Sequence, residues 1–188
     1  MKPHIATKDL TIFKKYLNQS KIYFEFGSGG STYTACHTPC IEKVFSVESD
    51  KQWIDTVREQ VQTDKLIQIF NEMGTVPNSW GHPGPNATNQ QKISYSNHIV
   101  SSASHSDIDI VFIDGRFRVA CCLKAFQVIK EDCFVLFDDF LNRPHYHVVL
   151  NYFDIIEKTS DNRLVVLRKK KGTHVPEDII KKYELIHD

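Results

Sequence analysis

The sequence lacks several features that mark common classes of protein. No apolar run is close to the length of about eighteen residues that a membrane-spanning helix needs. No leader with a cationic start and an apolar core is evident either. We therefore expect a soluble, unexported, cytoplasmic protein. The five cysteines have no Cys-x-x-Cys spacing, which argues against a zinc site or a disulfide framework and fits reduced thiols. The 23 basic and 23 acidic residues cancel, so no global charge attracts nucleic acid or an anionic membrane.

What the sequence does contain is a strand-like run that ends in a glycine-rich turn. Residues 22–31 read Ile-Tyr-Phe-Glu-Phe-Gly-Ser-Gly-Gly-Ser. The apolar run carries the acidic Glu25, the turn has bare backbone at Gly27, Gly29 and Gly30, and a polar helix start follows at Ser31. This order lets a bulky polar ligand lie against the main chain at the carboxyl end of a parallel strand.

A second acidic residue strengthens this interpretation. Glu48 lies about twenty residues after the turn and ends the next strand-like run, residues 43–47. An acid at this place can accept hydrogen bonds from both hydroxyls of a ribose. The two features together favour a nucleoside-containing cofactor. The alternative is a strand, turn and helix whose glycines serve geometry alone.

Strand-like and helix-like segments alternate along the rest of the chain. Apolar residues at helical spacing predict helices within residues 10–17, 53–61, 119–129 and 144–153. Ser49 and Gln52 have capping-box spacing at the start of the second of these helices. Strands are predicted at residues 66–70, 108–113 and 133–137, and a hairpin at residues 155–158 and 164–167. The pattern predicts an α/β fold: a Rossmann-like, doubly wound, mostly parallel seven-stranded sheet with a C-terminal antiparallel hairpin and helices on both faces.

A single domain spanning residues 1–188 is expected, with one region that breaks the alternation. Residues 73–91 are rich in glycine and proline and cannot form a regular helix. A loop this long in a compact domain is usually functional or disordered, and its position after the third strand allows it to close as a lid. Trp80 and His82 would then contact a ligand; alternatively, Trp80 anchors the loop to the body of the domain.

Acidic residues also follow two further predicted strands. Asp114 follows residues 108–113, and Asp138 and Asp139 follow residues 133–137. Because the carboxyl ends of neighbouring parallel strands converge, these acids should lie near one another and near the glycine turn. Oxygen ligands without histidine or cysteine favour Mg²⁺ or a similar hard ion. Such a metal could help to deprotonate a substrate hydroxyl.

The same acids have alternatives that involve no metal. They could pair with arginines in a structural network, since repulsion among like charges is relieved by cations. The arginines within reach are Arg116, Arg118 and Arg143. Asp138 could instead cap the helix that follows it.

These motifs together resemble a known family. The order of Glu25-Phe26-Gly27-Ser28-Gly29, Glu48, Asp114 and the closing hairpin resembles the class I S-adenosylmethionine-dependent methyltransferases, over about residues 20–170. Within that superfamily, Asp114 with Asp138-Asp139 is similar to the metal site of catechol O-methyltransferase-like enzymes. The resemblance implies S-adenosylmethionine as cofactor and Mg²⁺ bound by Asp114, Asp138 and Asp139.

The resemblance also implies a role for each residue of the cofactor site. Gly27, Ser28 and Gly29 would contact the methionine portion, Glu25 would orient the turn, and Glu48 would hold the ribose. Adenine would lie near Asn71 and Glu72, and Asp114 would serve the metal or the methionine ammonium group. The full set of implied cofactor-binding residues is Glu25, Gly27, Ser28, Gly29, Gly30, Ser31, Glu48, Asn71, Glu72 and Asp114.

The chain departs from the family pattern at two places. Ser31 replaces the third glycine of the usual turn, and Phe117 stands where catechol-type enzymes have a catalytic lysine. Asp114, Arg116 and His145 are the remaining candidates for catalysis. The imidazole of His145 titrates near neutrality and could act as a base; alternatively, it is a surface histidine at a helix start.

The predicted function is methyl transfer from S-adenosylmethionine to a hydroxyl of a small molecule or sugar, with possible metal assistance. The Asp-Gly-Arg-Phe at residues 114–117 lacks the Asn/Asp-Pro-Pro-aromatic signature of N-methyltransferases. One alternative is a non-catalytic domain that binds a partner or a nucleoside. A nicotinamide-dependent oxidoreductase is disfavoured because Thr32 occupies the sixth position of the dinucleotide fingerprint, where glycine is required. We expect no nucleic-acid or membrane partner, and the sequence does not indicate an oligomeric state.

Overall fold

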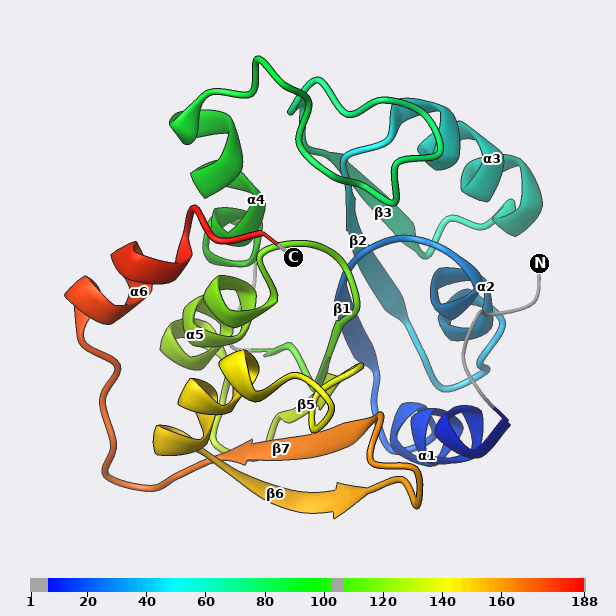
Figure 1. The fold of residues 1–188 in the computed structure, drawn as a ribbon. Coiled ribbons are helices and arrows are strands. Elements are labelled where there is room, and N and C mark those ends of the chain that lie inside the picture. Colours follow the sequence, from blue (N-terminus) through cyan, green and yellow to red (C-terminus); the bar gives the residue numbers. More distant parts are fainter. Residues whose placement is uncertain (1–6, 103–106, 188) are drawn as a thin grey trace.

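Seven strands form one mixed sheet in the order β3-β2-β1-β4-β5-β7-β6 (Figure 1). The computed structural model describes residues 7–102 and 107–187. Neighbouring strands are parallel from β3 through β5, whereas β7 runs antiparallel to both β5 and β6. The strands are β1 (Ile22–Phe26), β2 (Lys43–Glu48), β3 (Leu66–Phe70), β4 (Ile110–Ile113), β5 (Phe134–Phe137), β6 (Phe153–Lys158) and β7 (Val165–Lys169). The predicted sheet and its closing hairpin are therefore confirmed.

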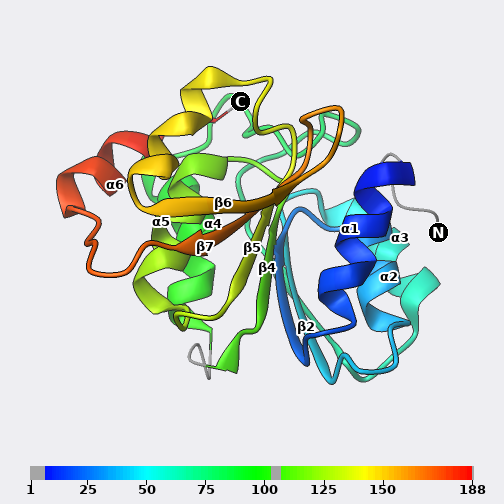
Figure 2. The same cartoon turned by 90° about the horizontal axis from the view of Figure 1, so that it is seen from below.

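Helices cover both faces of this sheet, as predicted. One face carries α1 (Thr7–Leu17), α2 (Gly30–Cys36) and α3 (Lys51–Val61) (Figure 2). The other carries α4 (Asn89–Ser101), α5 (Arg118–Val128), the 3₁₀ helix η2 (Pro144–Asn151) and α6 (Glu177–Tyr183). Within the described ranges, no helix has the length and apolar character needed to cross a membrane.

The central strands β1, β4 and β5 are almost completely buried because helices cover both faces of the sheet, whereas β3 and β6 are partly exposed. Side chains alternate along each strand, so Tyr23 lies in the core beneath α1–α3, and Phe24 and Phe26 lie in the core beneath α4 and α5. On β4, Phe112 and Ile113 divide between the two cores in the same way. This continuous burial explains why the central strands read as uninterrupted apolar runs.

Two local details differ from the predictions. The N-cap of α3 is Asp50, whose carboxylate accepts from the backbone N–H groups of Gln52 and Trp53, whereas Ser49 was the expected cap. The segment after Pro144 is a 3₁₀ helix, with proline in its first turn as expected. No helix lies between β3 and Asn89, so the glycine- and proline-rich loop is irregular over residues 73–88. Residues 89–91, which were expected to belong to the loop, form the first turn of α4, a helix that was not predicted.

The topology determines where a ligand crevice can lie. From β1 the chain moves outward to β2 and β3, then returns to β4 on the other side of β1. In open α/β sheets, ligands bind at such a reversal, beyond the carboxyl ends of the strands. The segments that follow β1, β2 and β4 meet at this place.

Candidate functional site

The glycine turn after β1 packs directly against the segment after β4. Gly27 has φ +96°, and a Cβ placed on it would lie 2.8 Å from the backbone nitrogen of Gly115. A Cβ on Gly115 would in turn lie 2.1 Å from the hydroxyl oxygen of the buried Tyr95. The two turns therefore meet backbone to backbone, and both positions require glycine. Sequence reasoning identified Gly27 but assigned no role to Gly115.

Glu25 lies beneath this turn and is completely buried. One carboxylate oxygen accepts from the Tyr23 hydroxyl at 2.7 Å and from Ser31 Oγ at 2.8 Å. The other accepts from Ser46 Oγ at 2.6 Å and from Thr32 Oγ1. Burial raises the pKa of Glu25, and these hydroxyl donors oppose the rise. Four donors occupy the carboxylate, so Glu25 acts on the protein's own turn.

The network around Glu25 extends into the turn along two routes. Ser46 Oγ lies 2.6 Å from Ser28 Oγ, and Thr32 Oγ1 accepts from the backbone N–H of Gly29 at 2.8 Å. Trp53 adds a third contact, because its indole N–H donates to the carbonyl of Ser28 at 2.8 Å. The turn is thus held from below by Glu25 and from the side by α3.

Glu48 lies at the end of β2 and faces the same turn. Its Oε2 accepts from the backbone N–H of Ser28 at 3.1 Å, and its Oε1 accepts from the N–H groups of Ser49 at 2.6 Å and Asp50 at 2.9 Å. Burial raises its pKa, and the three backbone donors oppose the rise. The structure therefore brings the glycine turn and the second acid together, as the sequence predicted.

Asp114 follows β4, and its side chain is 36% exposed. Arg118, at the start of α5, lies beneath it, with Nη2 3.1 Å from Asp114 Oδ1. The guanidinium also donates to the backbone carbonyls of Asp114, Gly115 and Asp138. Arg118 thereby connects the carboxyl ends of β4 and β5.

Asp138 and Asp139 are held by arginines as well. Arg163 Nη2 lies 3.2 Å from Asp138 Oδ2, and Arg163 Nε lies 3.0 Å from Asp139 Oδ1. Arg143 Nη2 contacts Asp139 Oδ2 at 3.0 Å, and Arg118 lies 3.7 Å from the same oxygen. The structural ion-pair network, one of the two readings open from the sequence, is present.

This donor set does not fit the expected magnesium site. Asp114, Asp138 and Asp139 each carry at least one guanidinium within salt-bridge distance, so a divalent cation would have to displace bound cations. Over residues 7–102 and 107–187, no group of three or more His, Cys, Asp or Glu side chains is placed to hold a metal ion. The metal expectation is corrected: the three carboxylates belong to an arginine network, and Asp138 does not cap η2, whose N-cap is Arg143.

Comparison with known proteins was informative only at the level of structure. No protein-family model matches the chain, and no curated protein sequence matches it significantly. A methyltransferase-like protein from Silicibacter pomeroyi has a similar structure, with a TM-score of 0.83, 23% identity, and coverage of 97% of this chain and 94% of that one. TrmK from M. capricolum, in complex with the cofactor product S-adenosyl-homocysteine, has a TM-score of 0.57 at 13% identity, covering 95% and 75%. A Staphylococcus aureus protein described as a caffeoyl-CoA O-methyltransferase has a TM-score of 0.57 at 15% identity, covering 89% and 86%.

The chain has the class I methyltransferase fold. At identities of 13–23%, the likeness concerns the fold. The strand order and the closing hairpin agree with it, as the motifs indicated.

In this methyltransferase fold, the residues expected near adenine differ in their surroundings. Asn71 is buried and bonds to α4: its Oδ1 accepts from Ser94 Oγ at 2.6 Å and lies 2.9 Å from His98 Nε2. Its amide donates to the carbonyl of Gln91 at 3.0 Å. Glu72 is exposed and accepts from the N–H of Gly74 at 2.7 Å. Asn71 therefore attaches α4 to the end of β3, whereas Glu72 lies at the surface.

The three candidates for catalysis occupy different places. Asp114 lies beside the glycine turn, and Arg116 Nη1 lies 3.1 Å from His82 Nε2 of the long loop. His145 is exposed in the first turn of η2, where its ring packs against Tyr146. The structure thus connects Asp114 and Arg116 to the strand ends, and it places His145 at the surface, as the alternative reading had it.

Sequence reasoning missed two parts of the site. Arg163 comes from the turn between β6 and β7, and the register that pairs Val165 with Phe137 carries it to Asp139. The indole of Trp53 was expected only as part of a helical face, yet it contacts the glycine turn. The antiparallel return of the hairpin was the signal that could have located Arg163. No signal in the sequence locates the indole contact.

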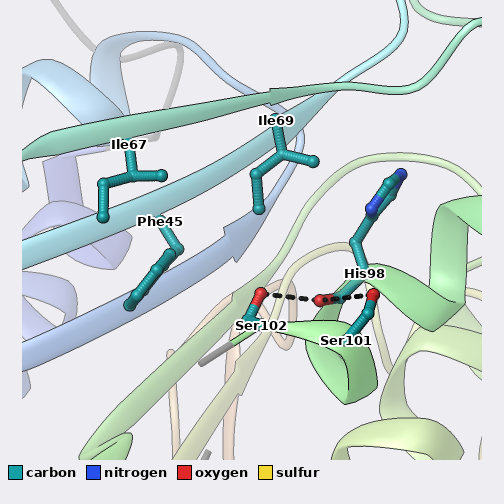
Figure 3. A pocket seen from close by; sticks show the side chains of 6 residues that line it. All are labelled: Phe45, Ile67, Ile69, His98, Ser101 and Ser102. Carbon is teal, nitrogen blue, oxygen red and sulfur yellow. Dashed lines mark hydrogen bonds between the residues drawn. The ribbon is translucent and has the colours of Figure 1, made fainter. Parts of the chain in front are cut away.

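A shallow pocket of about 400 Å³ lies elsewhere, between β2, β3 and the C-terminal end of α4 (Figure 3). Its lining residues are Phe45, Ile67, Ile69, His98, Ser101 and Ser102. These six share no member with the predicted cofactor-binding set. Burial lowers the pKa of His98, which adjoins Asn71. The pocket lies where β2 and β3 extend beyond the end of α4. We assign it no role in catalysis.

Asp114→Asn is expected to change how stability depends on pH. Burial raises the pKa of Asp114 to about 7; Arg118 opposes this, and the neighbouring Asp138 and Asp139 add to it. A raised pKa in the folded state means that this group's stabilising contribution is complete below about pH 4 and is lost as pH rises towards 7. Wild-type stability should therefore fall between about pH 4 and about pH 7, and the variant should show a shallower fall.

Urea denaturation at a series of pH values measures this slope. Asp55→Asn provides the control, because Asp55 pairs only with Lys51 on the exposed face of α3 and its side chain is 53% exposed. A slope for Asp114→Asn equal to that of wild type would contradict the assignment.

Proposed function

We propose that this protein is an S-adenosylmethionine-dependent methyltransferase that methylates a hydroxyl group of a small molecule or a sugar. The observation that carries the proposal is the contact between the two cofactor motifs. The bare turn at Gly27 meets Glu48 through the 3.1 Å hydrogen bond from Ser28, at the reversal point of the sheet. A neighbour of the same fold binds S-adenosyl-homocysteine, which supports the same cofactor class here.

Methyl transfer of this kind requires no covalent intermediate with the protein. Bound S-adenosylmethionine supplies a methyl group on a positively charged sulfur, and transfer is an in-line displacement that depends mainly on alignment and exclusion of water. An acceptor hydroxyl that took this methyl group would have to give up its proton to a residue of the chain. Asp114 is the group proposed to take this proton at its carboxylate, because it lies partly exposed beside the turn with a pKa of about 7.

Two features of the chain support a hydroxyl of a small molecule or a sugar as the methyl acceptor. The segment after β4 lacks the two prolines of the N-methyltransferase signature, because Gly115 and Arg116 follow Asp114 there. Neutral overall charge favours a small molecule or a glycan over nucleic acid. Metal assistance is not part of the proposal, because Arg118, Arg143 and Arg163 hold the expected ligands.

One observation favours the alternative of a non-catalytic, nucleoside- or partner-binding domain. The loop after β3 covers Glu48: a Cβ on Gly81 would lie 3.6 Å from Glu48 Oε1. A domain that had lost its cofactor could retain such a covered acid. The oxidoreductase alternative gains nothing, because Thr32 replaces the required glycine and bonds to Glu25.

Calorimetry separates these functions. Purified protein is titrated with S-adenosylmethionine, S-adenosylhomocysteine and NAD, each with and without Mg²⁺. Binding of the first two alone, unchanged by Mg²⁺, is the expected result. Binding of NAD alone would favour the oxidoreductase, and no binding of any of the three would favour the partner-binding domain.

Glu48→Gln is expected to weaken the binding of S-adenosylhomocysteine by about 1–3 kcal/mol. The amide retains the shape of the side chain but loses one acceptor, which leaves a ribose hydroxyl without its partner. Calorimetry measures the change. Glu42→Gln is the control, because Glu42 is exposed and pairs with Lys21 at the opposite end of β2. Equal affinity of the wild type and Glu48→Gln would place the ribose elsewhere.

A further inference from the structure

The loop that joins β3 to α4 has a closed neck. The backbone N–H of Gly84 donates to the carbonyl of Met73 at 2.8 Å, and Met73 is completely buried. A Cβ on Gly84 would lie 2.0 Å from the carbonyl oxygen of Gly74, so the two arms of the loop touch at glycines. A loop whose ends are held together in this way forms one compact unit, as Ω-loops do. Such a unit can move about its neck without unfolding the domain.

The tip of this loop, residues 78–82, which we term the strap, lies on the segment that follows β2. The backbone N–H of Asn78 donates to Asp50 Oδ2 at 3.3 Å, and Ser49 Oγ donates to the carbonyl of Gly81 at 3.1 Å. Asn78, Trp80 and Gly81 all have positive φ, which folds the tip tightly. Trp80 is 79% exposed, so the alternative in which it anchors the loop to the body of the domain is wrong.

The strap covers the acid that the proposed function assigns to the ribose. Gly81 lies above Glu48, and Glu48 is only 7% exposed. Its Oε1 already accepts from Ser49 and Asp50, and its Oε2 accepts from Ser28. Two ribose hydroxyls cannot reach both oxygens while the backbone of Gly81 occupies the approach.

A second group of side chains supports the strap from the other side. His82 Nε2 lies 3.1 Å from Arg116 Nη1, and its ring packs edge-on against that of His187 at 5.8 Å. His187 also packs against the buried Phe117 at 5.7 Å. The C-terminal segment is itself tied to α5, because Lys124 and Glu184 form a buried ion pair at 2.9 Å. Figure 1 shows this red segment running back over the strand ends.

We propose that the strap is an autoinhibitory segment: residues 78–82 exclude the ribose of the nucleoside cofactor from Glu48, and they swing away about the Gly74–Gly84 neck before the cofactor binds. The inference rests on the proposed function, since it concerns access to the same site. The closed state lowers the apparent affinity in proportion to the fraction of molecules that are open. The protein would then regulate cofactor entry through the strap's own contacts.

A reversible lock tests this directly. A Cβ on Gly81 would lie 3.2 Å from Ser49 Oγ, which is close to the spacing that a disulfide requires. In the double variant Ser49→Cys/Gly81→Cys, oxidation should weaken the binding of S-adenosylhomocysteine by about 100-fold or more relative to the same variant reduced with dithiothreitol. The reduced variant is the reference, because Gly81 has φ +75°, where any side chain is strained. Wild type treated with the same oxidant is the control for the five native cysteines.

Ser49→Ala tests the inference without a crosslink. It removes the hydroxyl bond to Gly81 and the longer 3.4 Å contact of the same hydroxyl with Glu48 Oε1, but it keeps the backbone N–H on Glu48. The closed state therefore loses the side-chain bond that holds the strap to Ser49. The association rate of S-adenosylhomocysteine in stopped-flow fluorescence should rise about fivefold, with little change in the dissociation rate. Val76→Ala is the matched control, because Val76 is in the same loop, outside the strap, and 58% exposed.

The outcomes are distinct. Equal binding by the oxidised and reduced double variant, or slower association in Ser49→Ala, overturns the strap proposal and leaves the proposed function standing. Absence of binding in wild type, Ser49→Ala and the reduced double variant alike overturns the proposed function, and the strap proposal with it. Binding by the wild type that becomes faster or tighter in Ser49→Ala, and weaker in the oxidised double variant, supports both.

Discussion

Arg118→Met is expected to lower the free energy of unfolding by about 3–5 kcal/mol, because removing one partner of a buried charged network leaves the others uncompensated. Arg118 is 3% exposed. Its guanidinium donates to the carbonyls of Asp114, Gly115 and Asp138 at 2.9–3.0 Å and lies 3.1 Å from the Asp114 carboxylate. Methionine fills a similar volume but offers none of these donors.

Urea denaturation measures the loss, and two controls define it. Arg58→Met removes an exposed arginine whose Nε bonds to Gln68 and should cost less than about 0.5 kcal/mol. Arg118→Lys keeps the charge but cannot span three carbonyls with a fork, so its cost should fall between those of the two methionine variants. A loss below about 1 kcal/mol for Arg118→Met would show that the ends of β4 and β5 are held by packing alone.

The same network indicates which part of the site the sequence could predict. Residues 114, 138 and 139 follow two apolar runs, so their convergence followed from the parallel sheet alone. Arg118 and Arg143 were among the partners considered for these acids, and both are present in the network. The sequence could not decide between arginine and metal, because an acid at the end of a strand looks the same whether it faces a metal or a guanidinium. Arg163 reaches Asp139 only through the hairpin's return beside β5, which is a long-range property of the fold.

The strands and most helices were predictable for a local reason. Continuous apolar runs such as residues 110–113 are buried on both faces, so tertiary packing agrees with the local pattern. Ser49 shows where local reasoning stopped. It has the spacing of a cap, but Asp50 takes that role and the Ser49 hydroxyl bonds to Gly81, more than thirty residues away. The long loop could be recognised as irregular from its glycines and prolines, whereas its position over Glu48 depends on contacts that no periodicity encodes.

Glu25→Ala is expected to lower the free energy of unfolding by about 3–5 kcal/mol, and it should also loosen the glycine turn. The variant leaves four buried hydroxyls without an acceptor, and each costs on the order of 1 kcal/mol; these belong to Tyr23, Ser31, Thr32 and Ser46. Thr32 and Ser46 are the two residues through which Glu25 reaches Gly29 and Ser28. Hydrogen exchange at residues 27–30 should therefore accelerate more than the global loss of stability explains.

Glu25→Gln separates the charge from the hydrogen bonds. The amide keeps one oxygen as an acceptor, and its nitrogen can donate to hydroxyls that reorient, so the loss should be about half that of alanine. Because burial raises the pKa of Glu25, the ionised form is less favoured in the folded state than in the unfolded chain. Its stabilising contribution is complete below the ordinary value of 4.5 and is lost as pH rises through the folded-state value. The penalty of Glu25→Gln relative to wild type should therefore shrink as pH rises above 4.5, and a penalty that grew instead would mean that the carboxylate is held there chiefly for its charge.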